Sequence, residues 1–113
     1  MSTPESKVKV KVKALLNDYG AFHHWPVQTG YGEPTLDCVG CHRGKYFAVE
    51  TKAPGQKLTP RQELTKERME QAGAKVFVIG QQEFPYPPMR ASQFGYTHSG
   101  LMELEAWLLQ LMR

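Results

Sequence analysis

The chain has 113 residues, of which 41% are hydrophobic and 22% charged, a balance that excludes a disordered protein. A single domain over residues 1–113 can bury a core without disulfide or metal staples. The net charge of +3 is compatible with a polyanionic partner. The sequence has no apolar run near the ~18 residues that a membrane span requires, and no secretory signal peptide, so we expect a cytoplasmic protein that does not bind membranes.

The N-terminal part of the chain fits two periodicities. Residues 1–6 are predicted to be disordered. In residues 5–18 Val8, Val10 and Val12 alternate with lysines, as in a strand, but Val8 and Val12 also fall with Leu15 on one helical face. The residues that follow are typical of a helix end, with Gly20 suited to the C′ position. A helix is the favoured interpretation of this segment.

The rest of the chain alternates apolar runs with turn residues and two amphipathic stretches. Thr59 and Pro60 are typical of a helix start, and the leucines after Ser99 predict a last helix that Ser99 caps. A loop as long as residues 80–98 suggests a function. The predicted elements are strands at 22–27, 35–42 and 45–52, a helix at 59–73, a strand at 75–79 and a helix from 99. This α-β-β-β-α-β-α order predicts a mixed sheet flanked by helices.

Two carboxylates and a lysine meet on the predicted hairpin. If Arg43-Gly44 is a two-residue turn, Asp37 lies directly opposite Glu50 on one sheet face, with Cβ atoms roughly 5 Å apart. Lys52 shares that face two positions further along. A turn at Gly44-Lys45 would place Asp37 opposite Lys52 and keep the three together. The intermediate register would place Asp37 on the other face.

Carboxylates in this position favour a metal-dependent reaction. Two ionised carboxylates directly opposite each other repel, and a hard divalent cation such as Mg²⁺ or Mn²⁺ converts them into a binding site. The metal would activate water and polarise a phosphodiester, while Lys52 would position the water or offset charge on the phosphate. The alternative is an ordinary polar strand face, on which Lys52 pairs with Asp37 or Glu50.

The cysteines and histidines allow a second interpretation. Cys38 and Cys41 point to opposite faces of a regular strand, so they share a zinc ion only if Gly40 forms a bulge. Packing of Cys38 in the core, as a small hydrophobic residue, is the favoured interpretation over a zinc or redox protein. Of His23 and His24, one is expected to pack and the other to be exposed.

A wider set of motifs gives a family resemblance. The motifs are Pro26-Val27-Gln28-Thr29-Gly30-Tyr31-Gly32, Thr35-Leu36-Asp37, Glu50-Thr51-Lys52-Ala53-Pro54-Gly55 and Leu58-Thr59-Pro60-Arg61-Gln62. Their order, over about residues 7–80, resembles the VRR-NUC branch of the PD-(D/E)XK nuclease superfamily, which has small stand-alone members in bacteriophages and bacteria. The sequence departs from the family's Pro-Asp dipeptide, because Leu36 precedes Asp37.

The resemblance implies both a fold and a reaction. The fold is α/β, with a restriction-endonuclease-like α-β-β-β-α-β core and a mixed sheet flanked by helices; the C-terminal helix is additional. The reaction is Mg²⁺- or Mn²⁺-dependent endonucleolytic hydrolysis of DNA, which in some members is selective for branched DNA such as Holliday junctions and is performed by homodimers. The expected location is the cytoplasm of a bacterial or phage-infected cell. The alternative is a non-catalytic nucleic-acid-binding module on this fold.

The resemblance also assigns roles at the hairpin. Asp37 and Glu50 match the family's two metal carboxylates, and Lys52 matches its catalytic lysine. Thr51 would offer its backbone carbonyl to the metal. These assignments agree with the face that the hairpin register predicts.

Further candidates lie outside the hairpin. By resemblance, Gln62 matches a glutamine at the edge of the site, and Glu5 is the candidate for an acidic metal ligand on the first helix. Lys57 and Arg61 are the best placed phosphate contacts, because they neighbour the predicted site. Tyr31 is an aromatic residue that could stack on bases or cover the core. Three aromatic residues of the 80–98 loop have the same two interpretations: Tyr86, Phe94 and Tyr96.

Overall fold

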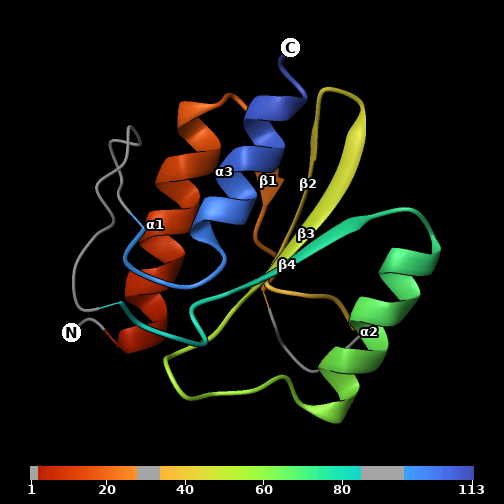
Figure 1. Ribbon diagram of the computed structural model, residues 1–113. Helices are drawn as coiled ribbons and strands as arrows, with labels where there is room; N and C mark the ends of the chain where they lie inside the picture. Colours follow the sequence, from red (N-terminus) through yellow and green to blue (C-terminus); the bar gives the residue numbers. More distant parts are fainter. Residues whose placement is uncertain (1–2, 28–33, 85–95) are drawn as a thin grey trace.

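The computed structural model describes residues 3–27, 34–84 and 96–113. Within these ranges a four-stranded sheet separates two helical layers, as Figure 1 shows. The elements are α1 (Pro4–Asp18), β1 (Phe22–His24), β2 (Cys38–His42), β3 (Lys45–Thr51), α2 (Pro60–Gln71), β4 (Lys75–Ile79) and α3 (Leu101–Gln110). This is the α-β-β-β-α-β-α order that the sequence predicts.

The sheet is mixed, with the strand order β1-β2-β3-β4. Strands β1, β2 and β3 pair antiparallel, with a tight turn between β2 and β3, whereas β3 and β4 are parallel. Parallel neighbours require a crossover, and α2 is the helix of that crossover. The carboxyl ends of β3 and β4 therefore lie side by side.

Helix α1 begins earlier than predicted. Pro4 occupies its first turn, and Thr3 is the N-cap of a capping box completed by Ser6. The prediction of disorder is therefore wrong for residues 3–6, and residues 1–2 lie outside the described ranges. The segment is therefore a helix and not a strand. The residues that α1 buries are spaced at helical intervals: Val8, Val12, Leu15 and Leu16.

The hydrophobic core has two parts, one on each face of the sheet. Helices α1 and α3 lie side by side over one face, and α2 lies over the other (Figure 1). The larger part includes the fully buried Phe47 and Leu104, and burial of each such side chain stabilises the fold by about 1.5–3 kcal/mol. The smaller part, under α2, contains Leu36, Ala48 and Val76. None of the described helices is long and apolar enough to cross a membrane.

Several predicted features differ from the structure. Strand β1 ends at His24 instead of Val27, and β2 begins at Cys38 instead of Thr35. Ser99 does not cap α3, because the N-cap is Gly100 and the Ser99 hydroxyl instead accepts a hydrogen bond from the backbone N–H of Gln82. Within the predicted 80–98 loop an isolated bridge pairs Glu83 with His98, and residues 85–95 lie outside the described ranges.

Candidate metal centre

The β2–β3 hairpin has the register that the two-residue turn predicts. Its pairs run from His42 opposite Lys45 to Cys38 opposite Val49. Arg43 and Gly44 have φ values of 51° and 82°, as a tight hairpin turn requires. Because the next pair in this register is Asp37 and Glu50, the two carboxylates lie at the same end of the hairpin.

Asp37 is held by the strand opposite. Its Oδ2 accepts hydrogen bonds from the Thr51 N–H at 3.0 Å and from the Thr51 hydroxyl at 2.7 Å. The Asp37 N–H in turn donates to Glu50 Oε1 at 3.1 Å. Both bonds to the carboxylate fall on Oδ2, which leaves Oδ1 without a donor among the described residues. The hydroxyl of Thr51 is a contact that the sequence analysis missed.

Glu50 is the buried member of the pair, with 3% of its surface exposed. Its Oε2 accepts a hydrogen bond from Gln62 Nε2 at 2.9 Å and lies 3.7 Å from Lys52 Nζ. The pKa of Glu50 is raised to about 7, chiefly by burial and then by the charge of Asp37, while the Asp37 N–H and Lys52 act in the opposite direction. The raised pKa means that the hydrogen bonds and the lysine around Glu50 do not fully offset the cost of burying its negative charge.

Gln62 is held in place by the start of α2. Thr59 and Gln62 form a capping box, in which Gln62 Oε1 accepts from the Thr59 N–H at 3.0 Å and the Gln62 N–H donates to the Thr59 hydroxyl at 3.2 Å. The amide nitrogen of Gln62 remains to donate to Glu50. The local signal that begins the helix therefore also supports a carboxylate of the site.

Lys52 is positioned from the neighbouring strand. Its N–H donates to the Ile79 carbonyl at 2.8 Å, and 9% of its surface is exposed. Gly80 follows Ile79 with a φ of 105°, and a Cβ added there would lie 2.1 Å from the Lys52 carbonyl oxygen. Only glycine permits this approach. Gly80 was not among the residues predicted to form the site, although its position directly after a buried strand is a sequence signal for such a close backbone contact.

Glu5 is not brought into a cluster with the two carboxylates. Its charge contributes weakly to the raised pKa of Glu50, and it forms an ion pair with Lys9 at 3.8 Å. Within residues 3–27, 34–84 and 96–113, no group of three or more His, Cys, Asp and Glu residues could hold a metal ion. The structure thus brings together Asp37 and Glu50, with Thr51, Lys52 and Gln62 in contact with them.

The predicted DNA contacts have different outcomes. Lys57 and Arg61 are exposed, the first in the segment before α2 and the second in its first turn. Tyr31 lies outside the described ranges, as do Tyr86 and Phe94. Tyr96 has 3% of its surface exposed and belongs to the core, so it does not stack on bases.

The cysteines follow the core interpretation. Cys38 is buried in the larger core, where burial raises its pKa to about 12, and Cys41 is exposed. Both thiols are free. His23 is partly buried, with its ring nitrogens bonded to Asn17 and Trp25, and His24 is exposed. Nothing in this arrangement favours a shared zinc ion.

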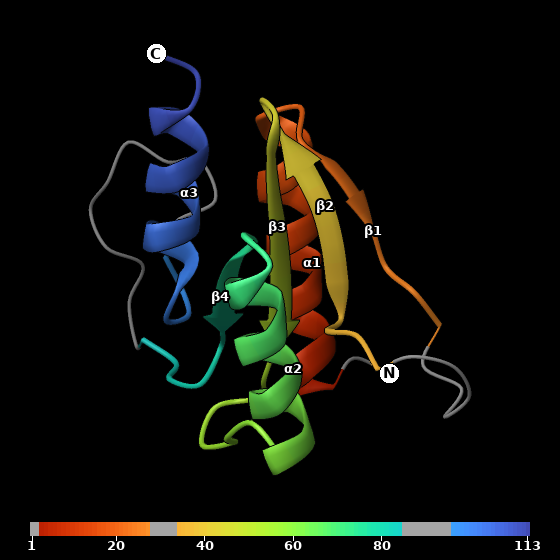
Figure 2. The same cartoon turned by 90° about the vertical axis from the view of Figure 1, so that its right-hand side faces the viewer.

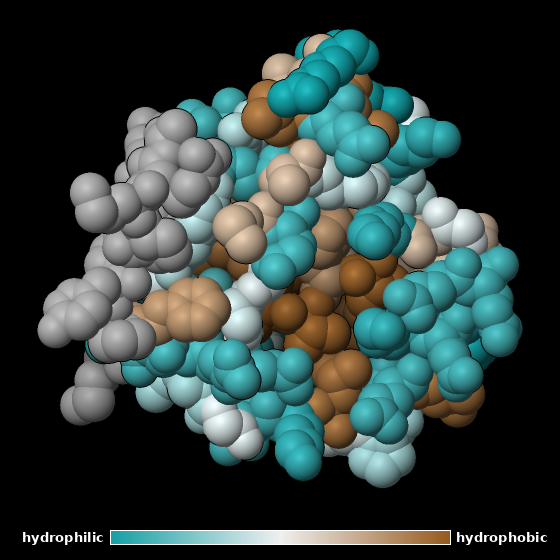
Figure 3. Space-filling model, in the orientation of Figure 1, coloured by the Kyte–Doolittle hydropathy of each residue, from teal (hydrophilic) through white to brown (hydrophobic). Residues whose placement is uncertain are grey.

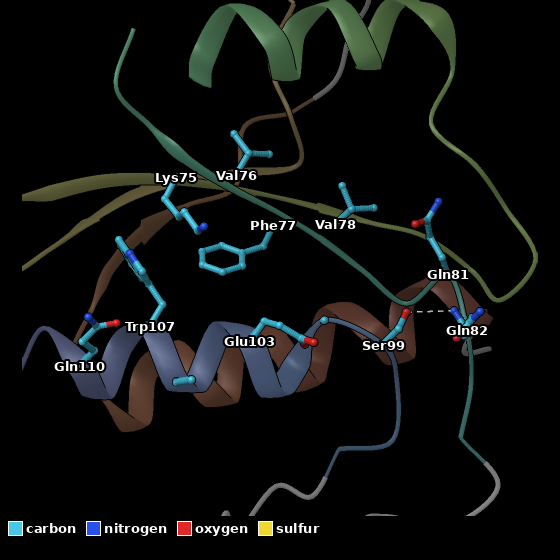
Figure 4. Close-up of a pocket in the computed structure, with 12 residues that line it drawn as sticks. Lys75, Val76, Phe77, Val78, Gln81, Gln82, Ser99, Glu103, Trp107 and Gln110 are labelled. Atoms are coloured by element: carbon cyan, nitrogen blue, oxygen red, sulfur yellow. Dashed lines mark hydrogen bonds between the residues drawn. The ribbon is translucent and has the colours of Figure 1, made fainter. Parts of the chain in front are cut away.

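A large cavity lies away from the carboxylates. It has a volume of about 710 Å³ and is lined by β4 and α3. Phe77 of β4 and Trp107 of α3 point into it (Figure 4). Figure 3 shows apolar surface over β4, the edge strand that borders this cavity. Asp37, Glu50 and Lys52 do not line it.

The comparisons with known proteins identify the fold. The sequence matches no protein-family model and no curated protein. A solved structure described as "VRR_NUC domain" is 28% identical, has a TM-score of 0.61, and the match covers 70% of this chain and 86% of that one. The chain has a VRR-NUC-like fold. The predicted α-β-β-β-α-β core, mixed sheet and additional C-terminal helix are thereby confirmed, and a VRR-NUC-like fold implies the PD-(D/E)XK nuclease superfamily.

Proposed function

We propose that this chain is a Mg²⁺- or Mn²⁺-dependent DNA endonuclease that hydrolyses phosphodiester bonds with Asp37, Glu50 and Lys52. One observation carries the proposal: within a VRR-NUC-like fold, a buried glutamate faces an aspartate and lies 3.7 Å from a lysine. Each partner comes from the hairpin that the sequence motif predicts.

The donor atoms fit a hard divalent cation. Asp37 Oδ1 and the Glu50 carboxylate offer oxygen ligands, with the Thr51 carbonyl as the third ligand implied by the family resemblance. The raised pKa of Glu50 reflects an ionised state that burial and Asp37 disfavour, and a cation between the two groups would stabilise that state. When bound, the metal supplies Lewis-acid activation of water and of the phosphate.

The other residues hold and complete the site. Thr51 fixes the Asp37 carboxylate through two hydrogen bonds, and Gln62 fixes Glu50 through one. The Lys52 ammonium then offsets the charge that develops on the phosphate oxygens. Because Lys52 is nearly buried and its backbone is paired with β4, its stem has few alternative conformations.

The partner that suits this site is DNA. Lys57, before α2, and Arg61, in its first turn, are exposed cations, and the chain has a net charge of +3. Selection of branched DNA and a homodimeric state are finer predictions taken from the family resemblance. A panel of labelled duplex, flap, single-stranded and four-way junction substrates in Mn²⁺, together with sedimentation of the protein, tests both.

Cleavage of supercoiled plasmid tests the proposal. We expect nicked and linear products with Mg²⁺ or Mn²⁺ and none in EDTA. The Asp37→Ala variant should be inactive, and the matched variant Glu67→Ala, which removes an exposed carboxylate of α2, should keep wild-type activity. Cleavage that survives EDTA or Asp37→Ala would contradict the proposal. Retention of DNA without cleavage at any metal concentration would instead support the non-catalytic alternative.

A further inference from the structure

Among the described residues, no helix covers the β1–β2 half of one sheet face. Figure 2 looks onto the face that carries α2, and that helix lies over the β3–β4 side while β1 and β2 have no helix in front of them. Exposure confirms that side chains do not fill the space: Phe22 is 71% exposed and Tyr46 is 54% exposed. Large apolar side chains this exposed on a sheet face need an explanation.

The exposed residues form one row across three strands. Phe22 pairs with Cys41, and Cys41 pairs with Tyr46, so all three point to the same side of the sheet. We call these three residues the aromatic row. Ala48 lies two positions after Tyr46 and packs under α2, and Glu50 lies two positions further. The aromatic row and the carboxylate pair thus share one face, separated by about 13 Å along β3.

A groove runs along α2 on the same face. One end is a pocket of about 300 Å³ between Tyr46 and the end of α2, and the other end is a pocket of about 220 Å³ beside Pro34 and Arg68. Both pockets are lined by Met69 and Ala72, so they adjoin. Pro34 precedes Asp37 by three positions, which brings this end of the groove toward the carboxylates.

The strand part of this face is positively charged. Residues 21–27 and 38–49 contain no Asp or Glu but include Arg43 and Lys45, whereas α2 has equal numbers of basic and acidic residues. Arg68 lines the groove, and Arg61 lies seven positions earlier on the same side of α2, because seven residues make nearly two helical turns. Arg43 is exposed at the hairpin turn, beyond the aromatic row. The face therefore combines an aromatic surface with arginines at the hairpin turn and along the groove.

We propose that the aromatic row binds an unpaired stretch of the nucleic acid strand, with bases stacked on Phe22 and Tyr46 and phosphates near Arg61 and Arg68. Aromatic side chains beside a positively charged groove are the arrangement by which proteins bind single strands without reading sequence. The inference rests on the proposed function, because it takes the strand on this face to be the one that enters the carboxylate site. It names the substrate class as DNA with unpaired bases next to the cleaved bond.

Binding of a short fluorescein-labelled single-stranded DNA, measured by anisotropy in EDTA, tests the inference. Phe22→Ala and Tyr46→Ala should each weaken binding by roughly 5- to 150-fold, the loss expected for one stacked base. Phe22→Tyr and Tyr46→Phe should bind like wild type, because the ring is kept. Met102→Ala and Leu109→Ala remove exposed apolar side chains of α3 and should have no effect. Affinity for the matching duplex should be unchanged in all variants.

Alkylation of Cys41 gives a second measure of DNA binding at the row, and it uses the wild-type protein instead of a substituted variant. Cys41 is exposed in the middle of the row, whereas Cys38 is buried and unreactive. Saturating single-stranded DNA should slow the reaction of Cys41 with iodoacetamide by tenfold or more. Duplex DNA should leave that rate unchanged. The Cys41→Ser variant should show no labelling.

The outcomes separate this inference from the proposed function. If the alanine variants bind single strands as tightly as wild type, the inference is wrong even where plasmid cleavage stands. If Phe22→Ala instead converts a dimer to a monomer by sedimentation, a second copy covers the row and the inference is wrong. If the row is required for single-strand binding but no substrate is cut, the binding surface is correct and the proposed reaction is not.

Discussion

At the scale of single residues, Glu50 is the position where folding and the proposed reaction conflict. A carboxylate that is 3% exposed and faces Asp37 weakens the metal-free fold once it ionises. Its folded pKa of about 7 is above the ordinary value of 4.5, so the stabilisation from this group is complete below pH 4.5 and is lost as the pH rises through 7. Because the metal binds only the ionised form, the conflict predicts a pH-dependent response to metal.

The predicted response is a rise in thermal stability on adding Mn²⁺ that grows with pH. The apparent Mn²⁺ affinity should fall roughly tenfold for each pH unit below 7, because protons then compete for Glu50. Calorimetric melting curves with and without Mn²⁺, between about pH 5.5 and pH 8, measure the difference at each pH. Taking the difference removes the titration of other groups, such as His23 and His98. A metal-induced gain that is the same at every pH would contradict the role given to Glu50.

Some site residues could be read from the sequence and others could not. Asp37, Glu50 and Lys52 were predictable because one turn fixes the hairpin register, and side-chain parity then places all three on one face. The Thr51 hydroxyl was not, because its contact depends on the rotamer of a strand side chain, and although Gly80 stands out in the sequence after a buried strand, its partner Lys52 does not. Contacts across non-local strands have no spacing rule.

At the scale of elements, the start of α2 contributes to both the helix and the site. Two of the described helices begin with a capping box, Thr3 with Ser6 in α1 and Thr59 with Gln62 in α2. Of these two boxes, the one in α2 is bonded to a carboxylate of the pair, through Gln62. The start of α2 was predicted from Thr59 and Pro60, whereas the same signal at Thr3 and Pro4 was missed at the start of α1. By contrast, Ser99 has the right residue type for a cap but is used in pairing with Gln82.

The two boxes provide a matched comparison. Thr3→Ala and Thr59→Ala should each lower the free energy of unfolding by about 0.5–2 kcal/mol, because each removes an N-cap hydroxyl. Only Thr59→Ala should also weaken Mn²⁺ binding, by up to about tenfold, because the hydrogen bond it removes, from the Gln62 N–H to the Thr59 hydroxyl, fixes the backbone of the residue whose side chain donates to Glu50. Urea denaturation and Mn²⁺ titration measure the two effects. Equal Mn²⁺ affinities in the two variants would show that the box does not support the site.

At the scale of the whole molecule, α1 and α3 are joined through a buried carboxylate. Glu105 of α3 is 8% exposed; its Oε2 accepts from the Tyr19 hydroxyl at 2.8 Å, and its Oε1 accepts from Tyr96. Burial and Glu105 together raise the pKa of Tyr19 to about 12. This contact fixes the C-terminal helix on the face of the sheet opposite α2. It was not predictable, because 86 residues separate Tyr19 from Glu105.

Removing one hydroxyl tests this connection. Tyr19→Phe should lower the free energy of unfolding by about 1–3 kcal/mol, because a buried carboxylate oxygen loses a donor. Tyr46→Phe, at an exposed tyrosine, should change it by less than about 0.5 kcal/mol. Urea denaturation of the two variants against wild type gives both values. Equal stabilities would mean that water replaces the Tyr19 hydroxyl without cost.

The central claim is that Asp37 and Glu50 hold a divalent metal, and direct titration with Mn²⁺ tests it without reference to any DNA substrate. By isothermal calorimetry near pH 8, wild-type protein should bind Mn²⁺. Asp37→Ala should lose that binding, and Glu67→Ala, which removes an exposed carboxylate, should keep it. Unchanged Mn²⁺ binding by Asp37→Ala, or no binding by wild type, would contradict the account.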